Sequence, residues 1–506
     1  MLEKFLNNRF NVLYLAPFII GSLTTLSFAP FNFTIVNFIT LPVFFYLLVY
    51  INKKSKAIYR NKPYKKNLFI FGLVFGFGFY LSGISWITNA LTFDKNFKIF
   101  IPFALIFIPL LLSLFLSLIT LIIGPYLKLN FPSLILFVAS IAFADFLRAN
   151  ILTGFPWNLW AYSTSWIHEI LQIVNIIGLH SYNLLVLTLF TSPIIIFFKI
   201  DKIKKVFICI FLALFVLSLY IYGNYEINKN KKILDKIEEK INIKVISPNF
   251  DLEYGLDISN IEERFKKLIR YSNPEKDKKT IFIWPEGVFS GYSFKEILSF
   301  RKLIKKNFHK NHFIIFGVNK VELVSGNFYN SMIIVNNNFD VIQSYNKRKL
   351  VPFGEFLPFE KLLNNFGLKK ITEGHGSFLR GDTDNNLEID KLNILPLICH
   401  EIIFTDLIQK SDENTNLIVN ISEDGWFGKS IGPDQHFVKA IFRAIEGNTF
   451  LLRSANRGVS AITDNKGKII KRINRNEAGN IEFEVPLIKS NKIKNDLIFF
   501  VLLITY

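Results

Sequence analysis

Three polar residues of the C-terminal half stand at the ends of strand-like apolar segments. Glu286 ends the segment TIFIWPE, Cys399 ends the segment NILPLIC, and Lys347 follows the segment SMIIVN and its turn. Catalytic groups of layered α/β folds tend to lie just past strand ends, where the sheet holds them rigidly. The three side chains are therefore candidates for a single site.

A cysteine, a carboxylate and an ammonium can together carry out acyl transfer through a covalent intermediate. The thiol must be activated before it attacks an acyl carbon. A carboxylate can take the thiol proton and return it, and it does so best with a pKa near neutrality. An ammonium can stabilise the thiolate and then the oxyanion of a tetrahedral intermediate. The residue types thus predict thiol-dependent acyl chemistry.

Each of the three residues has a plainer interpretation when it is taken alone. Glu286 follows Trp-Pro and could be a turn residue, and Lys347 belongs to a Lys-rich chain in which most lysines are solvated. A cysteine at the end of an apolar strand is more often an inert core residue than a nucleophile. The hypothesis therefore depends on the three contexts taken together.

Other site chemistries find little support in the sequence. The chain has two cysteines, and Cys209 lies in the apolar run FICIFLAL, where we expect a buried small hydrophobe. Cys399 is then the only cysteine of the polar half, which is too few for a thiolate zinc site, and the seven histidines are scattered. No phosphate-binding or dinucleotide glycine motif occurs. We expect neither a metal nor a cofactor.

The composition indicates a membrane protein. Of the 506 residues, 51% are hydrophobic and 55 are Phe. The net charge of +19 would suit nucleic acid only if the basic residues formed one face with a binding motif, and no such motif occurs. The basic residues gather instead in short loops between apolar runs, as membrane topology requires.

Seven apolar segments of the first 223 residues approach the ~20 residues that span a bilayer. We expect helices at 12–28, 33–51, 67–91, 98–125, 132–148, 170–198 and 205–223. The first segment is too long for a cleavable signal peptide and lacks a small-residue cleavage site, so we expect it to be retained. Ionisable residues within the segments are few, mainly Asp145, Arg148 and His180, which argues against a transporter.

The basic loops predict the orientation of the chain. Lys4 and Arg9, the loop 52–66 and the loop 199–205 should be cytoplasmic by the positive-inside rule. Even numbers of predicted helices separate these three segments, so the assignment is self-consistent. Seven helices that start inside place residue 224 outside.

The expected organisation is a membrane domain at 1–223, an extracytoplasmic domain at 224–494 and a last apolar segment at 495–506. The run LIFFVLLITY is only ten residues long. It either dips into the interface or begins a spanning helix, and we favour the start of a C-terminal membrane helix.

The polar half mixes short β-rich runs with helical patterns, which predicts a layered α/β domain. Strands are expected at 243–248, 280–286, 312–318, 331–336, 393–399, 416–422 and 459–464. Helices are expected at 258–271, 294–307 and 435–448. The fold class is therefore a multi-pass α-helical membrane domain plus an α/β domain.

Several longer motifs resemble a known superfamily. WPEG, YNKRKLVPFGEFLPFE, ICHE, ISEDGWFGKSIGPDQH and RSANRGVSAI are similar to signatures of the nitrilase, or carbon-nitrogen hydrolase, superfamily. In the membrane half, FAPF, FGLVFGFGFYLSGISW and GFPW are similar to those of its membrane-embedded branch, the apolipoprotein N-acyltransferases. The resemblance spans nearly the whole chain.

The resemblance implies a four-layer α-β-β-α sandwich and a role for each site residue. Glu286 takes the place of the general base, Lys347 that of the oxyanion-stabilising cation and Cys399 that of the nucleophile. Glu355, in PFGE, matches a second carboxylate that helps to hold the site, and Glu401 matches an acidic residue after the nucleophile. Both receive a supporting role.

Two positions depart from the family pattern. His400 stands where an aromatic residue often follows the nucleophile. Glu423 replaces the Asn of the motif usually written S/T-N-D-x-W-F. Neither departure removes a member of the trio, and both bear on how the substrate is positioned.

The resemblance also implies a reaction, a set of partners and a location. A glycerophospholipid would donate an acyl group, from sn-1, to Cys399 as a thioester, and the N-terminal diacylglyceryl-cysteine of an apolipoprotein would accept it. This is the last step of lipoprotein maturation, at the bacterial inner membrane with the catalytic domain on the periplasmic side.

Two other functions remain open from the residues alone. One is a membrane-anchored nitrilase-type amidase or hydrolase, although an anchor needs one helix rather than seven or eight. The other is a non-enzymatic lipid-binding scaffold, against which the intact trio argues. Replacing Cys399 with Ser would abolish turnover in an enzyme and leave a scaffold or transporter unaffected.

Overall fold

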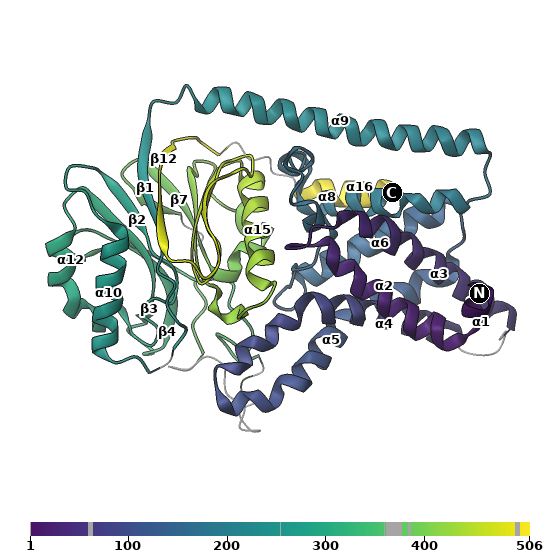
Figure 1. Ribbon diagram of the computed structural model, residues 1–506, viewed down its shortest axis with the longest axis horizontal. Coiled ribbons are helices and arrows are strands. Elements are labelled where there is room, and N and C mark those ends of the chain that lie inside the picture. The colour runs from purple at the N-terminus through teal and green to yellow at the C-terminus, as the bar shows by residue number, and fades with distance from the viewer. Residues whose placement is uncertain are drawn as a thin grey trace. The chain divides into compact units, whose positions relative to one another are not determined.

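A computed structural model describes residues 2–58, 64–253, 255–358, 360, 377–382, 386–490 and 496–506 of the chain. The chain divides into two compact units (Figure 1), one formed by Met1–Glu226 with Asn495–Tyr506 and the other by Ile227–Lys494. The predicted boundary between residues 494 and 495 lies outside the described residues.

The first unit is helical because its sequence is a series of long apolar runs. Its longer helices are α2 (Ala16–Thr24), α3 (Asn37–Ile58), α4 (Tyr64–Ile84), α5 (Ile101–Ile123), α6 (Phe131–Asn150), α8 (Val174–Thr191), α9 (Lys202–Leu234) and α16 (Asp496–Thr505). Short helices and helical turns extend or connect them: α1 (Leu2–Asn7), η1 (Asn11–Leu15), η2 (Thr25–Ser27), η3 (Thr34–Val36), η4 (Ser85–Thr92), η5 (Lys95–Phe100), η6 (Gly124–Tyr126), η7 (Trp160–Thr164), α7 (His168–Leu171) and η8 (Ser192–Phe197).

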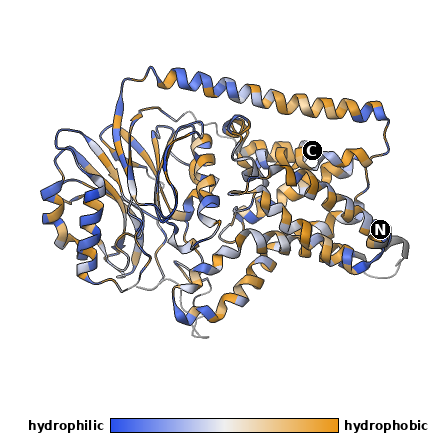
Figure 2. Cartoon of the chain, in the orientation of Figure 1, coloured by the Kyte–Doolittle hydropathy of each residue, from blue (hydrophilic) through white to orange (hydrophobic). Residues whose placement is uncertain are grey.

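Six helical spans among the described residues are long and apolar enough to cross a membrane, and Figure 2 shows their hydrophobic character. They are Thr34–Lys54, Lys65–Thr92, Lys95–Tyr126, Phe131–Asn150, Val174–Phe197 and Lys202–Leu234. They correspond to six of the seven predicted segments. The segment predicted at 12–28 forms a shorter apolar helix, Asn11–Ser27. The last span continues beyond its predicted end at residue 223 because the charged lead-in to the polar half is itself helical as far as Leu234.

Small residues allow α4 and α5 to approach closely. A Cβ atom added at Gly72 would lie 2.1 Å from Thr120 Oγ1, and one added at Gly76 would lie 2.9 Å from Ser113 Cβ. Helices in lipid gain no hydrophobic free energy by associating, so such close backbone contacts supply much of their attraction. The Gly-rich character of this stretch therefore has a packing reason.

A buried ion pair fixes the GFPW turn within the helical unit. Arg148 Nη2 contacts Asp145 Oδ1 at 2.7 Å, and Asn183 of α8 donates to the other Asp145 oxygen at 2.9 Å. Arg148 also donates to the carbonyl oxygen of Phe155, which lies in that turn. Charges buried in a helical membrane unit are costly unless they are paired. The paired Arg148 therefore satisfies the Phe155 carbonyl oxygen, which lies in non-helical backbone.

The second unit contains two six-stranded sheets. Their strands are β1 (Lys240–Ser247), β2 (Thr280–Ile283), β3 (His312–Val321), β4 (Phe328–Val335), β5 (Val341–Asn346), β6 (Leu387–Ile389), β7 (Leu392–Ile398), β8 (Leu417–Glu423), β9 (Phe450–Asn456), β10 (Ser460–Thr463), β11 (Ile469–Ile473) and β12 (Gly479–Pro486). The strand orders are β12-β1-β2-β3-β4-β5 and β11-β10-β9-β8-β7-β6. Strands β1, β2 and β3 are parallel to one another, as are β7, β8 and β9.

Helices cover the outer faces of both sheets. The helices and helical turns described in this unit are α10 (Ile258–Ser272), α11 (Phe294–Ile297), η9 (Leu298–Phe300), α12 (Arg301–Asn307), η10 (Cys399–Ile403), α14 (Thr405–Gln409), η11 (Asp424–Phe427) and α15 (Gly432–Gly447). Figure 1 shows α10 and α12 beside one sheet and α15 beside the other. The predicted α-β-β-α sandwich is thus confirmed.

Two apolar clusters explain the layering. One joins the inner faces of the sheets through residues such as Val245, Ile315 and Val419, which are fully buried. The other lies between the first sheet and its helices, where Phe265 of α10 packs on Trp284 and Phe289. A shift of one residue in the pairing of two strands would turn these buried side chains to the opposite face. The apolar clusters therefore fix the strand register, and the register determines where each strand ends.

The predicted strands correspond to β1, β2, β3, β4, β7, β8 and β10, while β5, β6, β9, β11 and β12 were not predicted. The helix expected at 294–307 is broken into α11, η9 and α12. The helix expected at 435–448 begins three residues earlier, with Gly432-Pro433 in its first turn. Proline is favoured at this position because the first helical N–H groups have no partner within the helix.

Replacing Gly76 with Leu should destabilise the helical unit by about 1–3 kcal/mol, because the larger side chain overlaps α5. The apparent melting temperature of the purified protein in detergent measures the effect. Ser218→Leu, at an exposed position of α9, serves as the control and should leave the melting temperature unchanged. Equal stability of the two variants would contradict the close helix packing.

Candidate active site

Cys399 lies on a sharp turn at the end of a parallel strand. It is the first residue after β7, and its φ of 52° falls in the left-handed region. A non-glycine residue in this region is strained and persists only where the surroundings impose it. Asn420 of β8 imposes it by donating to the carbonyl oxygens of Leu397 at 2.9 Å and of Cys399 at 3.4 Å. The half-buried thiol is thus presented at the sheet edge.

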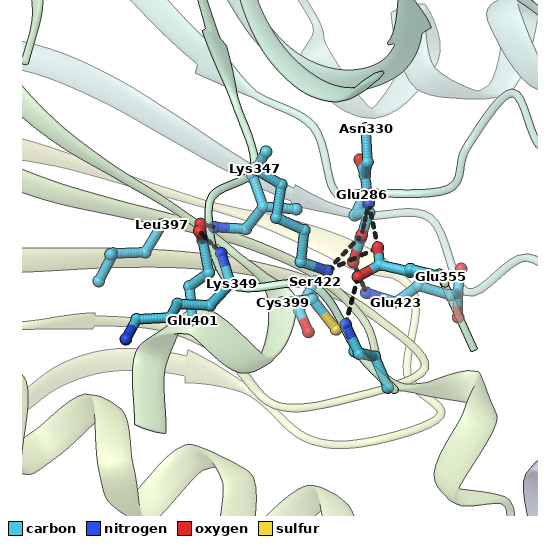
Figure 3. A network of polar contacts seen from close by, with 12 residues as sticks. Glu286, Asn330, Lys347, Lys349, Glu355, Leu397, Cys399, Glu401, Ser422 and Glu423 are labelled. Carbon is cyan, nitrogen blue, oxygen red and sulfur yellow. Dashed lines mark hydrogen bonds and ion pairs between the residues drawn. The ribbon is translucent and has the colours of Figure 1, made fainter. Parts of the chain in front are cut away.

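Lys347 carries a buried ammonium group between two carboxylates. It follows β5, is 1% exposed, and places Nζ 2.8 Å from Glu355 Oε1 and 3.6 Å from Glu286 Oε1. Figure 3 shows this ammonium and both carboxylates joined by polar contacts, with Cys399 beside them. The structure therefore brings Glu286, Lys347, Glu355 and Cys399 together from distant parts of the sequence.

Asn330, in β4, bridges the carboxylates of Glu286 and Glu355, and it was not among the predicted site residues. Its Nδ2 donates to Glu286 Oε1 at 2.8 Å and to Glu355 Oε1 at 2.7 Å. The second oxygen of Glu355 accepts the Val351 N–H at 2.8 Å. No motif marked Asn330, because its role appears only once β4 lies beside the turn after β2.

The charges around Lys347 and Cys399 determine their proton affinities. Burial alone would lower the pKa of Lys347, but Glu355 and Glu286 outweigh it and raise that pKa above its usual range. Burial, followed by the negative Glu286, raises the pKa of the Cys399 thiol, whereas Lys347 lowers it. The resting thiol is therefore protonated, and its activation needs a base such as Glu286 with a cation nearby.

Glu401 braces the turn that carries Cys399 rather than joining the charged cluster. One of its oxygens accepts hydrogen bonds from Tyr345 Oη and from the backbone N–H groups of Arg348 and Lys349, at 2.8–3.0 Å. The other accepts the Ile398 N–H at 2.8 Å. Glu401 thus connects the loop after Lys347 with the residue before the nucleophile.

A second buried network supports the end of β8. Asp424 accepts hydrogen bonds from Ser422 Oγ at 2.7 Å and from Arg453 Nη2 at 2.8 and 2.9 Å, and it contacts His436 Nδ1 at 3.0 Å. Burial would raise the pKa of Asp424, but Arg453 and His436 outweigh it and lower that pKa. These residues occur in the motifs ISEDGWFGKSIGPDQH and RSANRGVSAI, so the sequence signalled their segments but not their contacts.

The two departures from the family pattern both lie at this site. Burial and then the positive Lys347 lower the pKa of His400 well below its usual range, so its ring is neutral, and it packs edge-on against Phe404. Glu423 donates its backbone N–H to Glu286 Oε2 at 3.1 Å. Across the described part of the chain, no group of three or more His, Cys, Asp or Glu side chains is arranged to hold a metal ion.

Two family models match the chain. Residues 20–192 match the apolipoprotein N-acyltransferase N-terminal domain, and residues 253–494 match the carbon-nitrogen hydrolase model. An apolipoprotein N-acyltransferase of Rickettsia prowazekii is 30% identical over 476 residues, which cover 92% of this chain and 91% of that protein. One of Bradyrhizobium diazoefficiens is 30% identical over 481 residues, which cover 92% and 88%.

Solved structures of nitrilase-superfamily proteins match about half of this chain. Saccharomyces cerevisiae Nit3 is 15% identical with a TM-score of 0.37 and covers 49% of this chain and 91% of its own. A Nesterenkonia amidase is 14% identical with a TM-score of 0.36 and covers 50% and 93%.

Replacing Glu401 with Gln should destabilise the second unit by about 1–3 kcal/mol, because the amide group leaves backbone donors on one side unsatisfied. Thermal unfolding should show an apparent melting temperature several degrees lower than that of the wild type. Glu484→Gln, at an exposed position of β12, is the matched control. A melting temperature that does not change in the Glu401 variant would rule out the bracing role.

Proposed function

Because this chain belongs to the apolipoprotein N-acyltransferase family, we propose that Cys399 takes an acyl group from a glycerophospholipid as a thioester and passes it to an apolipoprotein. The chain is an acyltransferase and a membrane protein whose acceptor is a lipoprotein. The observation that carries the proposal is the buried Lys347 ammonium between Glu286 and Glu355, in one cluster with Cys399.

In the first half-reaction, Glu286 removes the proton from Cys399 Sγ. The thiolate attacks the ester carbonyl carbon of the phospholipid, and Lys347 stabilises the oxyanion that forms. The intermediate collapses with cleavage of the ester C–O bond. The alkoxide of the lysophospholipid takes the proton from Glu286 and leaves, and the thioester remains on Cys399.

In the second half-reaction, the α-amine of a diacylglyceryl-cysteine at the acceptor's N-terminus attacks the thioester. Glu286 accepts a proton from the amine, Lys347 again stabilises the oxyanion, and the C–S bond breaks. The proton then passes to Cys399 Sγ, so the enzyme returns to its starting state. The product carries its third acyl chain in amide linkage.

The supporting residues act by holding this cluster in place. Asn330 and Glu355 fix Lys347 and Glu286 relative to each other through three contacts of 2.7–2.8 Å. Glu401 and Asn420 hold the two sides of the turn that presents Cys399. Such preorganisation avoids reorganisation of charges during the reaction.

The membrane unit has a physical role in this proposal. Moving an acyl chain of sixteen carbons into water would cost roughly 12 kcal/mol, at about 0.8 kcal/mol per CH₂. A site at the bilayer surface avoids that cost for both substrates. We place the catalytic unit on the periplasmic side of the bacterial inner membrane, an orientation that the basic loops support.

An acyl-enzyme assay tests the proposal directly. Purified protein with Cys209→Ser, which leaves Cys399 as the only thiol, should acquire an acyl adduct on the Cys399 peptide when it meets labelled phospholipid. A diacylglyceryl peptide with a free α-amine should discharge the adduct to an N-acyl peptide, and mass spectrometry follows both species. Cys399→Ser should form no thioester and show no transfer.

The same assay separates the alternatives. A peptide with a blocked α-amine is the control and should leave the adduct in place. An adduct that disappears equally fast in buffer would identify a hydrolase rather than a transferase. Absence of any adduct in the active protein would refute the thioester.

A further inference from the structure

Arg453, in β9, is a buried arginine of which every side-chain nitrogen atom donates a hydrogen bond. Its Nε donates to the carbonyl oxygen of Val459 at 3.2 Å, and its Nη1 donates to Asn420 Oδ1. Its Nη2 donates to the two oxygens of Asp424 at 2.9 and 2.8 Å. Arg453 lies opposite Asn420 in the pairing of β9 with β8, and β8 in turn pairs with β7, the strand before Cys399. The guanidinium group therefore lies one strand away from the nucleophile's own strand.

The burial of Arg453 calls for an explanation other than stability alone. Its side chain is fully buried, and Asp424 compensates its charge. Desolvation of two buried charges offsets much of their attraction, so an ion pair of this kind is weak evidence of a stabilising role. What a guanidinium offers in addition is direction, because its N–H donors lie in one fixed plane and it has no acceptor.

Arg453 determines which way the side-chain amide of Asn420 points. Because a guanidinium only donates, the amide turns its oxygen toward Arg453 and its Nδ2 group toward β7. There Nδ2 donates to the carbonyl oxygens of Leu397 at 2.9 Å and of Cys399 at 3.4 Å. A flipped amide would place its oxygen against these two carbonyl oxygens and would repel both. Arg453 thus secures the contact that holds Cys399 at its φ of 52°.

A second chain of contacts leads from Arg453 to the side chain of Cys399. Asp424, which Arg453 holds through both oxygens, accepts a hydrogen bond from Ser422 Oγ at 2.7 Å. The Ser422 side chain is also hydrogen-bonded to the side chain of Cys399. Arg453 is therefore connected both to the backbone and to the sulfur of the nucleophile.

Both half-reactions depend on the position of Cys399 Sγ. Attack requires reacting atoms about 3–3.5 Å apart and aligned, and a misplacement of about 1 Å can cost about a hundredfold in rate. The left-handed backbone of Cys399 is strained, and such strain persists only where the surroundings impose it. Relaxation of this turn would change where Sγ points relative to Glu286 and Lys347.

We propose that Arg453 is a positioning residue for acyl transfer, which orients Asn420 and Asp424 so that the turn and the sulfur of Cys399 stay in the attacking position. The inference rests on the function proposed above and adds a residue from outside the charged cluster around Lys347. Arg453 touches neither substrate, and it exchanges no proton in the reaction.

A purely structural Arg453 would give a different kinetic result. Loss of a structural residue lowers the fraction of folded protein, whereas each folded molecule keeps the wild-type rate. Loss of a positioning residue lowers the rate of each folded molecule. It leaves the phospholipid concentration at half-maximal rate unchanged, because the interaction that is lost acts on the reaction step and not on phospholipid binding.

A double-mutant cycle on the full-length protein tests the inference, with Arg453→Lys, Asn420→Ala and the double variant. Lysine keeps a positive charge for Asp424 but lacks the fixed fork that reaches Asn420 and Asp424 together. Acylation of Cys399 by labelled phosphatidylethanolamine is followed in single turnovers, and each rate is expressed per folded molecule. Arg472→Lys, at an exposed position of β11, takes the place of Arg453→Lys in a control cycle.

Arg453→Lys and Asn420→Ala should each slow acylation by about ten- to a hundredfold, with an unchanged half-maximal phospholipid concentration. The double variant should react within about threefold of Arg453→Lys alone, because the two residues act as one unit. Arg472→Lys should leave the rate unchanged, both alone and together with Asn420→Ala. Asn420→Asp, which keeps an acceptor for Arg453 but loses the Nδ2 donor, should be as slow as Asn420→Ala.

A folded Arg453→Lys protein that reacts at the wild-type rate, or a double variant in which the two losses multiply, would overturn the inference. If Arg453→Lys does not fold, Asn420→Asp decides the matter, because a wild-type rate in that variant contradicts the orientation of the amide. All of these results leave the acyltransferase proposal intact as long as the wild type forms the thioester. Failure of the wild type to form a thioester would instead refute the proposed function.

Discussion

The site depends on one buried positive charge. Lys347 is almost completely removed from water, and an ammonium in that position is stable only when negative groups compensate it. Glu286 and Glu355 supply that compensation, and Asn330 keeps the two carboxylates from separating. Removal of Lys347 would leave two buried carboxylates facing each other without a compensating charge. This constraint explains why the base, the cation and the thiol can keep their relative positions without a bound substrate.

The fold meets this constraint with strand ends from both sheets. Glu286 and Lys347 follow β2 and β5 of one sheet, whereas Cys399 and Glu423 lie at the ends of β7 and β8 of the other. The dry apolar layer between the sheets fixes their separation, because a change of register would expose every inward side chain. In the helical unit, Arg148 is likewise paired with Asp145, and it donates a hydrogen bond to the backbone of the GFPW segment. In both units, paired buried charges hold irregular backbone in a single conformation.

Residue patterns were sufficient to predict β2 and β7, which precede Glu286 and Cys399, because apolar runs and their polar ends are local features of the sequence. They did not predict β5, which precedes Lys347. They also predicted the apolar helices and the layered fold. They could not predict Asn330, whose contacts to Glu286 and Glu355 depend on the pairing of β3 with β4. They assigned Glu401 a supporting role but did not predict the N–H groups that donate to it, because Arg348 lies more than fifty positions away. They also did not predict the contact between Glu423 and Glu286, which are more than a hundred positions apart. Strands such as β5 and β11, with several exposed residues, lack the continuous apolar run that marks a buried strand.

The reactivity of Cys399 toward a neutral alkylating reagent is the most direct measure of the central claim that Lys347 stabilises the thiolate. The measurement uses protein with Cys209→Ser, so that Cys399 is the only thiol, and compares Lys347→Met with Lys320→Met, a lysine exposed on β3. Lys347 lowers the pKa of the Cys399 thiol, and a nearby opposite charge typically shifts a pKa by about 1–3 units. The Lys347 variant should therefore react at least about tenfold more slowly at pH 8. The Lys320 variant should react at the wild-type rate. A Lys347→Met protein that keeps its fold and reacts as fast as the wild type would contradict the account.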